Sequence, residues 1–178
     1  MEKKLKTYVI FVSRTYPAYH SKKGQLTHFI DRIIYGIKYH NTNYHPNFHW
    51  GNDKIHTFRG NYQLWKKRVD EVLDGKAVIV LKYHSLGRYV KGNKQIEFVR
   101  LDKNSGVGVQ KAELNFKTLV SRIDEDAFNQ NIDQLGRNDG LEWEDFREWF
   151  LKGKYDLREP LACIQFTSFR YGTLPSPK

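Results

Sequence analysis

The run Lys54-Ile55-His56-Thr57-Phe58-Arg59 places a lysine, a histidine, a hydroxyl group and an arginine in one short segment with strand-like alternation. An aromatic and histidine-rich segment, 39–50, precedes this run, and the basic segment Trp65-Lys66-Lys67-Arg68 follows it. Cationic and ring-bearing side chains are therefore concentrated around one point of the chain. This concentration indicates a pocket for a flat, anionic ligand, and a nucleotide meets both descriptions.

The size and charge of the chain limit its fold and its partners. The chain has 178 residues and a formal net charge of +10. This length suffices for one hydrophobic core, so we expect a single domain over residues 1–178. The charge favours polyanionic partners, RNA, DNA or free nucleotides, bound less tightly as salt rises. An anionic membrane surface is the competing partner, but no long apolar run and no cationic amphipathic helix supports it; alternatively, the lysines only maintain solubility.

Cysteine usage and the first residues bear on the compartment. Cys163 is the single cysteine, so no disulfide can form within the chain, and its apolar neighbours predict a buried thiol. The apolar run Tyr8–Val12 is too short for a secretory signal, and no apolar stretch reaches the roughly eighteen residues of a membrane span. We therefore expect a cytoplasmic protein.

Hydrophobic periodicity predicts strands and helices in irregular order. Strands are expected at Tyr8–Val12, 54–59, Ala77–Leu81, Ile96–Leu101, after the turn at 105–110, and at Leu161–Phe169. Helices are expected from Thr27 to about Tyr39, from Tyr62 to Asp74, near Phe128, and from Trp143 to Leu151, where the aromatic residues share one side.

The order of these elements lacks the strict strand–helix alternation of a doubly wound parallel sheet. It predicts an α+β fold in which a mixed sheet curls into a small β-barrel with flanking helices. We interpret residues 1–50 as an N-terminal strand–helix extension, 115–137 as an insert, and 172–178 as a disordered tail.

Several features follow one another in an order that is typical of a known family. They are the lysine-x-x-threonine-x-arginine run at 54–59, a helix closed by Gly75, the strand segment Ile96-Glu97-Phe98, the turn Asp139-Gly140 before an aromatic helix, and Ile164-Gln165-Phe166-Thr167. In these features, over roughly residues 50–170, the chain resembles the ASCH domains of the PUA-like superfamily. The resemblance implies a PUA-like curled β-barrel and an RNA-binding role, often linked to translation or RNA modification.

The same resemblance implies a candidate catalytic set. One bacterial branch of the superfamily hydrolyses acetylated cytidine with a lysine, a threonine three residues on and a glutamate on a later strand, which match Lys54, Thr57 and Glu97 by motif position. Amide hydrolysis needs a nucleophile, a base and positive charge near the oxyanion. Thr57 would attack or orient water, Lys54 would act as base or stabilise the oxyanion, and Glu97 would shuttle the proton.

Strand geometry sets a condition on this catalytic set. Residues i and i+3 of a regular strand face opposite sides, so Lys54 and Thr57 can share a pocket only if Lys54 lies in the preceding turn or a bulge intervenes. The alternative is that Thr57 is an ordinary β-forming residue, Lys54 an exposed charge at the strand end, and Glu97 a surface residue paired with a cation.

Three residues outside the catalytic set are candidates for nucleic-acid binding. Arg59 can hold a phosphate with its planar guanidinium group, or it can form a salt bridge to a carboxylate such as Glu97. Trp65 can offer a stacking surface or seat its helix on the sheet. Arg14 belongs to a second basic and aromatic cluster, 14–23, that would line the same cleft.

The loop 84–94 adds three further candidates, because Arg88, Lys91 and Lys94 stand there with Tyr89 among flexible glycines. This composition is typical of a loop that contacts a nucleic-acid backbone, and equally of an exposed hairpin.

No feature predicts a metal or another cofactor. His45, His49 and His56 lack the spacing of a metal site, since Pro46 opposes the helix that would align the first two. The preferred interpretation is an RNA- or modified-nucleoside-binding domain. The alternative is an amidohydrolase that deacylates a modified nucleoside, and a third possibility is an interaction module with a protein partner.

Overall fold

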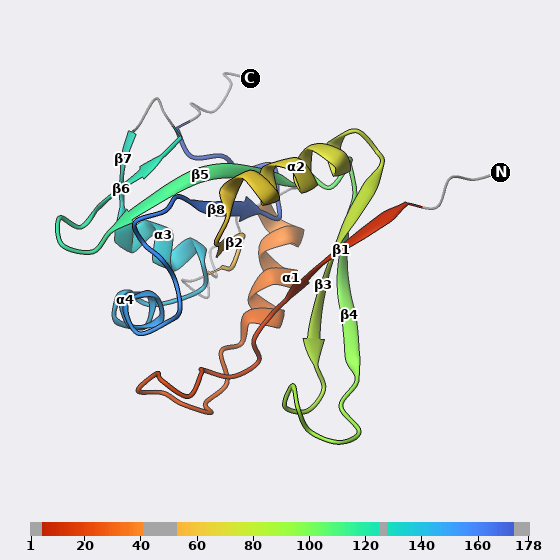
Figure 1. Ribbon diagram of the computed structural model, residues 1–178, viewed down its shortest axis with the longest axis horizontal. Helices are drawn as coiled ribbons and strands as arrows, with labels where there is room; N and C mark the ends of the chain where they lie inside the picture. The colour runs from red at the N-terminus through yellow and green to blue at the C-terminus, as the bar shows by residue number, and fades with distance from the viewer. Residues whose placement is uncertain (1–4, 41–52, 125–127, 173–178) are drawn as a thin grey trace.

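The computed structural model describes residues 5–40, 53–124 and 128–172, which form an α+β fold (Figure 1). The strands in these ranges are β1 (Lys6–Phe11), β2 (His56–Arg59), β3 (Ala77–His84), β4 (Gln95–Leu101), β5 (Gly108–Asn115), β6 (Val120–Ile123), β7 (Phe128–Asn131) and β8 (Leu161–Gln165). The helices are α1 (Phe29–His40), α2 (Tyr62–Leu73), α3 (Ile132–Asn138) and α4 (Trp143–Leu151). Among the described residues, no helix has the length and apolar character needed to cross a membrane.

The described strands form two sheets rather than one closed barrel. The three-stranded sheet has the order β1-β3-β4, with β1 parallel and β4 antiparallel to β3. The five-stranded sheet has the order β2-β8-β5-β6-β7, with antiparallel neighbours throughout. The chain changes sheets between β4 and β5, and these two strands are not paired with each other. The predicted α+β class is confirmed. The expected closed barrel is not formed by the described strands, because they belong to two separate sheets.

The strand composition explains how the sheets are covered. Residues 77–81 of β3 and all of β8 are buried, as expected for interior strands with apolar residues on both faces. Along β5, buried residues alternate with half-buried ones until the exposed last residue. Helix α2 packs against β3 and also against β5 and β8, so it joins the two sheets over one hydrophobic core.

The N-terminal strand and helix are integral to this fold. Strand β1 pairs with β3 along its whole length, and α1 runs between the two sheets in Figure 1. A Cβ atom on Gly36 of α1 would lie 3.0 Å from Ile55 Cγ2, so the helix approaches the chain before β2 closely because this residue is glycine. The predicted extension therefore supplies part of the core, including Ile10 and Ile33.

The predicted insert 115–137 extends the five-stranded sheet. Strands β6 and β7 pair antiparallel beyond β5, and α3 follows at once. The helix expected near Phe128 is wrong at that position, because 128–131 form β7 and the helix begins at Ile132. Asn131 caps it by accepting a hydrogen bond from the Asp133 amide at 2.9 Å. The predicted tail lies outside the described residues apart from Gly172.

The loop between β1 and α1 is held on α4 by polar contacts. Tyr16 Oη and Lys22 Nζ donate to Asp145 Oδ2 at 3.0 and 2.6 Å, and Ser21 Oγ donates to Glu148 Oε2 at 2.5 Å. The next residue of α4, Phe146, is fully buried in the core. Helix α4 is therefore held by polar contacts to this loop and by apolar packing.

Packing of α4 gives a prediction for stability. Replacing Phe146 by alanine removes a ring that is 0% exposed, and we expect a loss of about 3–5 kcal/mol in the free energy of unfolding. Leu151→Ala, at an exposed position of the same helix, is the control and should cost less than about 1 kcal/mol. Urea denaturation measures both; equal losses would show that α4 does not pack as described.

Candidate functional site

A cavity of about 110 Å³ lies where the end of β1, the start of α1, β2 and α4 meet. Polar groups and aromatic rings share its wall. The polar residues are Ser13, Lys54, Thr57, Arg59, Asp139 and Tyr155, and the apolar ones are Phe11, Val12, Phe29, Phe58, Trp149 and Phe150. We call this cavity the Lys54 pocket. It brings together three of the residues selected from the sequence, namely Lys54, Thr57 and Arg59.

Lys54 enters the pocket from an isolated bridge with Asp139, just before β2 begins. Its side chain is only 3% exposed, and Nζ donates to Asp139 Oδ1 at 2.5 Å and to the Asp139 carbonyl at 2.7 Å. The same Nζ lies 4.3 Å from the centre of the Phe29 ring. Because Lys54 precedes the regular strand, strand alternation does not separate it from Thr57, which satisfies the geometric condition set by the sequence.

Burial governs the protonation of this ion pair. Desolvation lowers the pKa of Lys54, and the attraction of the Asp139 carboxylate opposes it only in part. Desolvation likewise raises the pKa of Asp139 against the attraction of the Lys54 ammonium group. Both directions mean that removal of the charges from water costs free energy. The pair therefore holds its charges less firmly than a solvent-exposed ion pair would.

Arg59 forms a fixed positive charge in the pocket wall. Its Nη1 donates to Thr57 Oγ1 at 3.1 Å and to the Phe58 carbonyl at 2.9 Å, and Nη2 donates to the Phe11 carbonyl at 2.9 Å. These acceptors are neutral oxygens, so in the described part of the chain Arg59 does not form the alternative salt bridge to Glu97. Because Thr57 Oγ1 accepts from Arg59, its own hydroxyl proton can point toward a ligand.

His56 lies behind the ion pair in a buried hydrogen-bonded chain. Asn138 Nδ2 donates to Tyr171 Oη at 2.7 Å, and its Oδ1 accepts from Gln134 Nε2 at 2.9 Å, which fixes the orientation of the amide. Tyr171 Oη lies 2.8 Å from His56 Nε2. Burial raises the pKa of Tyr171, so the phenol keeps its proton and donates it to this nitrogen.

The neutral His56 ring then carries its own proton on Nδ1. Burial, with the nearby charge of Lys54, lowers the pKa of His56 well below its ordinary value, so the ring is neutral near pH 7. Nδ1 has no hydrogen-bond partner among the described residues, and it lies 3.7 Å from Asp139 Oδ1. A small shift of the Asp139 carboxylate would complete a chain from Tyr171 through His56 and Asp139 to Lys54.

Gly140 allows Lys54 to lie against the turn that carries Asp139. Its φ of 77° is a left-handed conformation that favours glycine, and a Cβ atom there would lie 3.0 Å from Lys54 Cβ. Arg32 of α1 donates a hydrogen bond to the Gly140 carbonyl. Contacts from the chain before β2 and from α1 therefore fix the turn that presents Asp139.

Glu97 does not line the Lys54 pocket. It lies on β4 of the three-stranded sheet, opposite Lys82, with an exposed side chain whose carboxylate pairs with Arg100 at 2.8 Å. Thr57 belongs to the other sheet. The expected set of Lys54, Thr57 and Glu97 is thus not assembled, because strand order alone does not determine which sheet a strand joins. Asp139 is the carboxylate beside Lys54.

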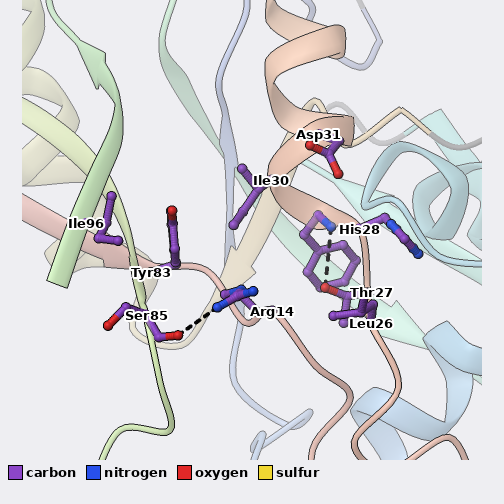
Figure 2. Close-up of a pocket in the computed structure, with 10 residues that line it drawn as sticks. Arg14, Leu26, Thr27, His28, Ile30, Asp31, Tyr83, Ser85 and Ile96 are labelled. Atoms are coloured by element: carbon purple, nitrogen blue, oxygen red, sulfur yellow. Dashed lines mark hydrogen bonds between the residues drawn. The ribbon is translucent and has the colours of Figure 1, made fainter. Parts of the chain in front are cut away.

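Two of the candidate binding residues lie elsewhere. Trp65 is 7% exposed within the core, and the Arg68 guanidinium lies 4.7 Å from its ring, so packing is its observed role. Arg14 lines a separate groove of about 360 Å³ between the start of α1 and the β3–β4 hairpin (Figure 2). Its Nη1 donates to the Ser85 carbonyl at 2.8 Å, as Figure 2 shows.

The other three candidates, Arg88, Lys91 and Lys94, are exposed on the hairpin between β3 and β4. They do not line the Lys54 pocket. The hairpin nevertheless adjoins it, because His84 at its base stacks on Phe11, a pocket residue, with ring centres 4.7 Å apart and an interplanar angle of 8°.

Asp139 and Trp149 line the pocket although the sequence does not single them out as candidates for a site. The signal for Asp139 is a carboxylate in the turn before an aromatic helix. Trp149 shares one side of that helix with the other aromatic residues, but it is half-buried and its ring lies 5.7 Å from that of Phe29. The predicted burial of Cys163 is confirmed, and burial raises the pKa of its thiol.

Comparison of the chain with protein families, with curated proteins and with solved structures gave no match. Within the ranges that the structure describes, no group of three or more histidine, cysteine, aspartate or glutamate side chains could hold a metal ion. His45 and His49 lie outside those ranges.

The buried ion pair gives a prediction for stability. Asp139→Asn leaves a buried ammonium group without its counter-charge, and we expect a loss of about 3–5 kcal/mol in the free energy of unfolding. The double variant Lys54→Met/Asp139→Asn removes that charge and should recover at least about 2 kcal/mol. Denaturation of both variants and of Lys54→Met completes a double-mutant cycle. Additive losses in the free energy of unfolding would contradict an interaction between Lys54 and Asp139.

The pH dependence of Asp139→Asn is part of the same test. Without the carboxylate, the folded-state pKa of Lys54 falls further below its ordinary value, so the unfolded chain binds more protons than the folded one at mildly alkaline pH. The free energy of unfolding of this variant should therefore rise between pH 7 and about pH 9.5 more steeply than that of the wild type.

Proposed function

We propose that the protein binds RNA or a modified nucleoside by taking one base into the Lys54 pocket. The observation that carries this proposal is that Lys54, Thr57, Arg59 and Asp139 line a single small cavity whose remaining wall is mostly aromatic. A base offers hydrogen-bonding groups on its edge and two flat faces. The pocket offers a complement to both.

The size of the pocket supports a base rather than a larger ligand. At about 110 Å³ the cavity is well below the roughly 300–1,000 Å³ that encloses drug-sized molecules. It has room for a ring but not for a ring with its sugar and phosphate. The backbone of a bound strand would therefore lie outside, on the surface of a protein with a net charge of +10.

The polar groups of the pocket supply both donors and acceptors. The Lys54 ammonium and the Thr57 hydroxyl donate, while the Asp139 carboxylate accepts. A base edge that carries an amino group beside a ring nitrogen or carbonyl presents the matching pattern. Burial lowers the pKa of Lys54 and raises the pKa of Asp139, and both shifts favour proton exchange with such an edge.

Membership of the ASCH type of PUA-like domain belongs to the same proposal. Its support is that the lysine, threonine and arginine of the run at 54–59 line one cavity, as residues of a shared binding motif would. Under this proposal the barrel that the resemblance implies is divided between two sheets in this protein.

RNA affinity tests the proposed function. Arg59→Met removes a fixed charge from the pocket wall and should weaken binding of a labelled single-stranded RNA of about 12 nucleotides roughly tenfold at about 50 mM salt. The slope of log affinity against log salt should become shallower by about 1. Fluorescence anisotropy measures both quantities.

Lys103→Met is the matched control, because it removes one exposed positive charge beyond the end of β4 that is remote from the hairpin. We expect its affinity to change less than about twofold. Equal losses in the two variants would mean that only net charge matters. Absence of RNA binding by the wild type at low salt would remove the proposal.

Hydrolysis of an acylated base is the second candidate function. The observation that favours it is a buried lysine of lowered pKa beside the Thr57 hydroxyl and the Asp139 carboxylate. Water oriented by the Thr57 hydroxyl would add to the amide carbonyl while the pocket base takes one of its protons. Transfer of that proton to the amide nitrogen lets the C–N bond break, which releases a carboxylic acid and the neutral amino group of the base. Asp139 takes the place that Glu97 held in the expected set.

Two nearly isosteric variants test this second function on a panel of N-acetylated nucleosides. Thr57→Val removes the hydroxyl group while retaining the side-chain shape, and we expect turnover to fall at least about a hundredfold. Glu97→Gln should leave turnover unchanged, because Glu97 lies on the other sheet. Turnover by Thr57→Val at the wild-type rate would eliminate this mechanism, and loss of turnover in Glu97→Gln would return that residue to the site.

A further inference from the structure

The β3–β4 hairpin carries positive charge that its own neighbours do not balance. Between Lys82 and Ile96 the sequence contains three lysine or arginine residues and no aspartate or glutamate. Arg88, Lys91 and Lys94 of this hairpin are all exposed. An unbalanced charge at the end of a projecting hairpin is suited to contact with phosphate groups.

The same hairpin exposes apolar side chains at its tip. Tyr89 is 89% exposed, and Leu86 and Val90 are 51% and 52% exposed. Among the large apolar side chains of the described residues, Tyr89 is the most exposed. The Arg88 guanidinium lies 5.3 Å from the Tyr89 ring centre, but this contact leaves most of the ring in solvent. The tip therefore gains most from a partner that buries aromatic surface and carries negative charge.

Hydrogen bonds hold the tip in one shape before any partner binds. The Ser85 amide donates to the Lys94 carbonyl at 2.9 Å, and Asn93 Oδ1 accepts from the Leu86 amide at 3.2 Å. Two tight turns follow, with Val90 N bonded to the Gly87 carbonyl at 2.9 Å and Asn93 N to the Val90 carbonyl at 3.1 Å. A preformed tip loses less conformational entropy on binding than a flexible loop does.

The base of the hairpin adjoins the Lys54 pocket. Phe11 links them, because this residue lines the pocket, its ring stacks on His84, and its carbonyl accepts from Arg59. The groove of Figure 2 lies alongside, with Arg14, Tyr83 and Ser85 on the hairpin side, and Phe29 borders both this groove and the pocket. From His84 to Tyr89 the chain can extend at most about 16 Å, a distance of a few base pairs.

We propose that the hairpin engages a nucleic-acid duplex and that Tyr89 inserts into the base stack beside the base that enters the Lys54 pocket. This inference rests on the proposed function and specifies its substrate as double-stranded RNA rather than an open strand. A paired base can reach a closed pocket only by leaving its stack, and an inserted side chain fills the resulting space. A single strand would need the cationic groups but not a rigid apolar tip.

Duplex and single-strand affinities test the inference. The probes are an RNA duplex of about 20 base pairs with one 2-aminopurine, and the labelled strand alone, both at about 50 mM salt. We expect the wild type to raise 2-aminopurine fluorescence in the duplex, because the base leaves the stack. Tyr89→Ser should weaken duplex binding about tenfold and abolish the fluorescence rise, while single-strand binding changes less than about twofold. The site is exposed, so the variant should fold normally.

Tyr89→Phe is the matched control and should bind the duplex as the wild type does, since the ring is retained. Equal binding of the duplex by Tyr89→Ser and Tyr89→Phe would overturn the inference. So would Tyr89-dependent binding to vesicles containing phosphatidylserine together with Tyr89-independent duplex binding, which would assign the tip to a membrane surface. Failure of the proposed function gives a different result: the Arg59→Met variant would then bind both RNA probes with the same affinity as the wild type.

Discussion

The buried contact between Lys54 and Asp139 is the interaction on which the arrangement of the site depends. It joins the start of the five-stranded sheet to the turn between α3 and α4, through both a backbone bridge and the side-chain ion pair. Close approach at Gly36 and Gly140 brings α1 and the turn against the same short segment. If this contact were lost, β2 would no longer be aligned with the turn, and Thr57 and Arg59 would lose the carboxylate that faces them.

A buried ion pair makes this connection at a large cost in desolvation free energy. Apolar residues of similar volume commonly serve as well or better, because two buried charges lose more hydration than their attraction returns. The pair nevertheless lies at a cavity wall, where a ligand that enters can use both groups. A second buried polar contact, between Tyr171 and His56, lies behind Asp139. These features support the proposal that the pocket binds a polar ligand.

The local sequence indicated which residues of the segment 54–59 line the site, but it did not indicate which carboxylate lies beside them. Strand alternation predicted only that a shared cavity for Lys54 and Thr57 required Lys54 to lie in a turn or a bulge, and the structure meets this condition because β2 begins at His56. Whether Glu97 or Asp139 lies beside Lys54 depends on the packing of segments that are distant in the sequence. Hydrophobic periodicity does not predict that packing. The apolar periodicity of α1, α2 and α4 predicted those helices well. Strands β6 and β7 are too short to show a period, so a helix was placed where β7 lies.

The aromatic residues of α4 also show that periodicity does not predict long-range packing. Helical spacing correctly predicts that Trp143, Phe146, Trp149 and Phe150 share one side of α4. It does not predict that Phe146 and Phe150 are buried while Trp149 reaches the edge of the core and becomes part of the pocket wall. Burial at the edge of a helix face depends on which loop covers it, here the segment between β1 and α1.

The division of the strands into two sheets has a consequence for how the pocket and the hairpin act together. Phe11 ends β1 of one sheet, yet its carbonyl accepts from Arg59 of the other, and its ring stacks on His84 of the hairpin. A ligand that displaced Arg59 or the Phe11 ring would thus change the contact at the base of the hairpin, although the pocket and the hairpin belong to different sheets. In a closed barrel, continuous backbone pairing would hold β1 and β2 rigidly. Here β1 and β2 are connected through the Phe11–Arg59 hydrogen bond instead, so under the proposed function the entry of a base would affect the placement of the hairpin.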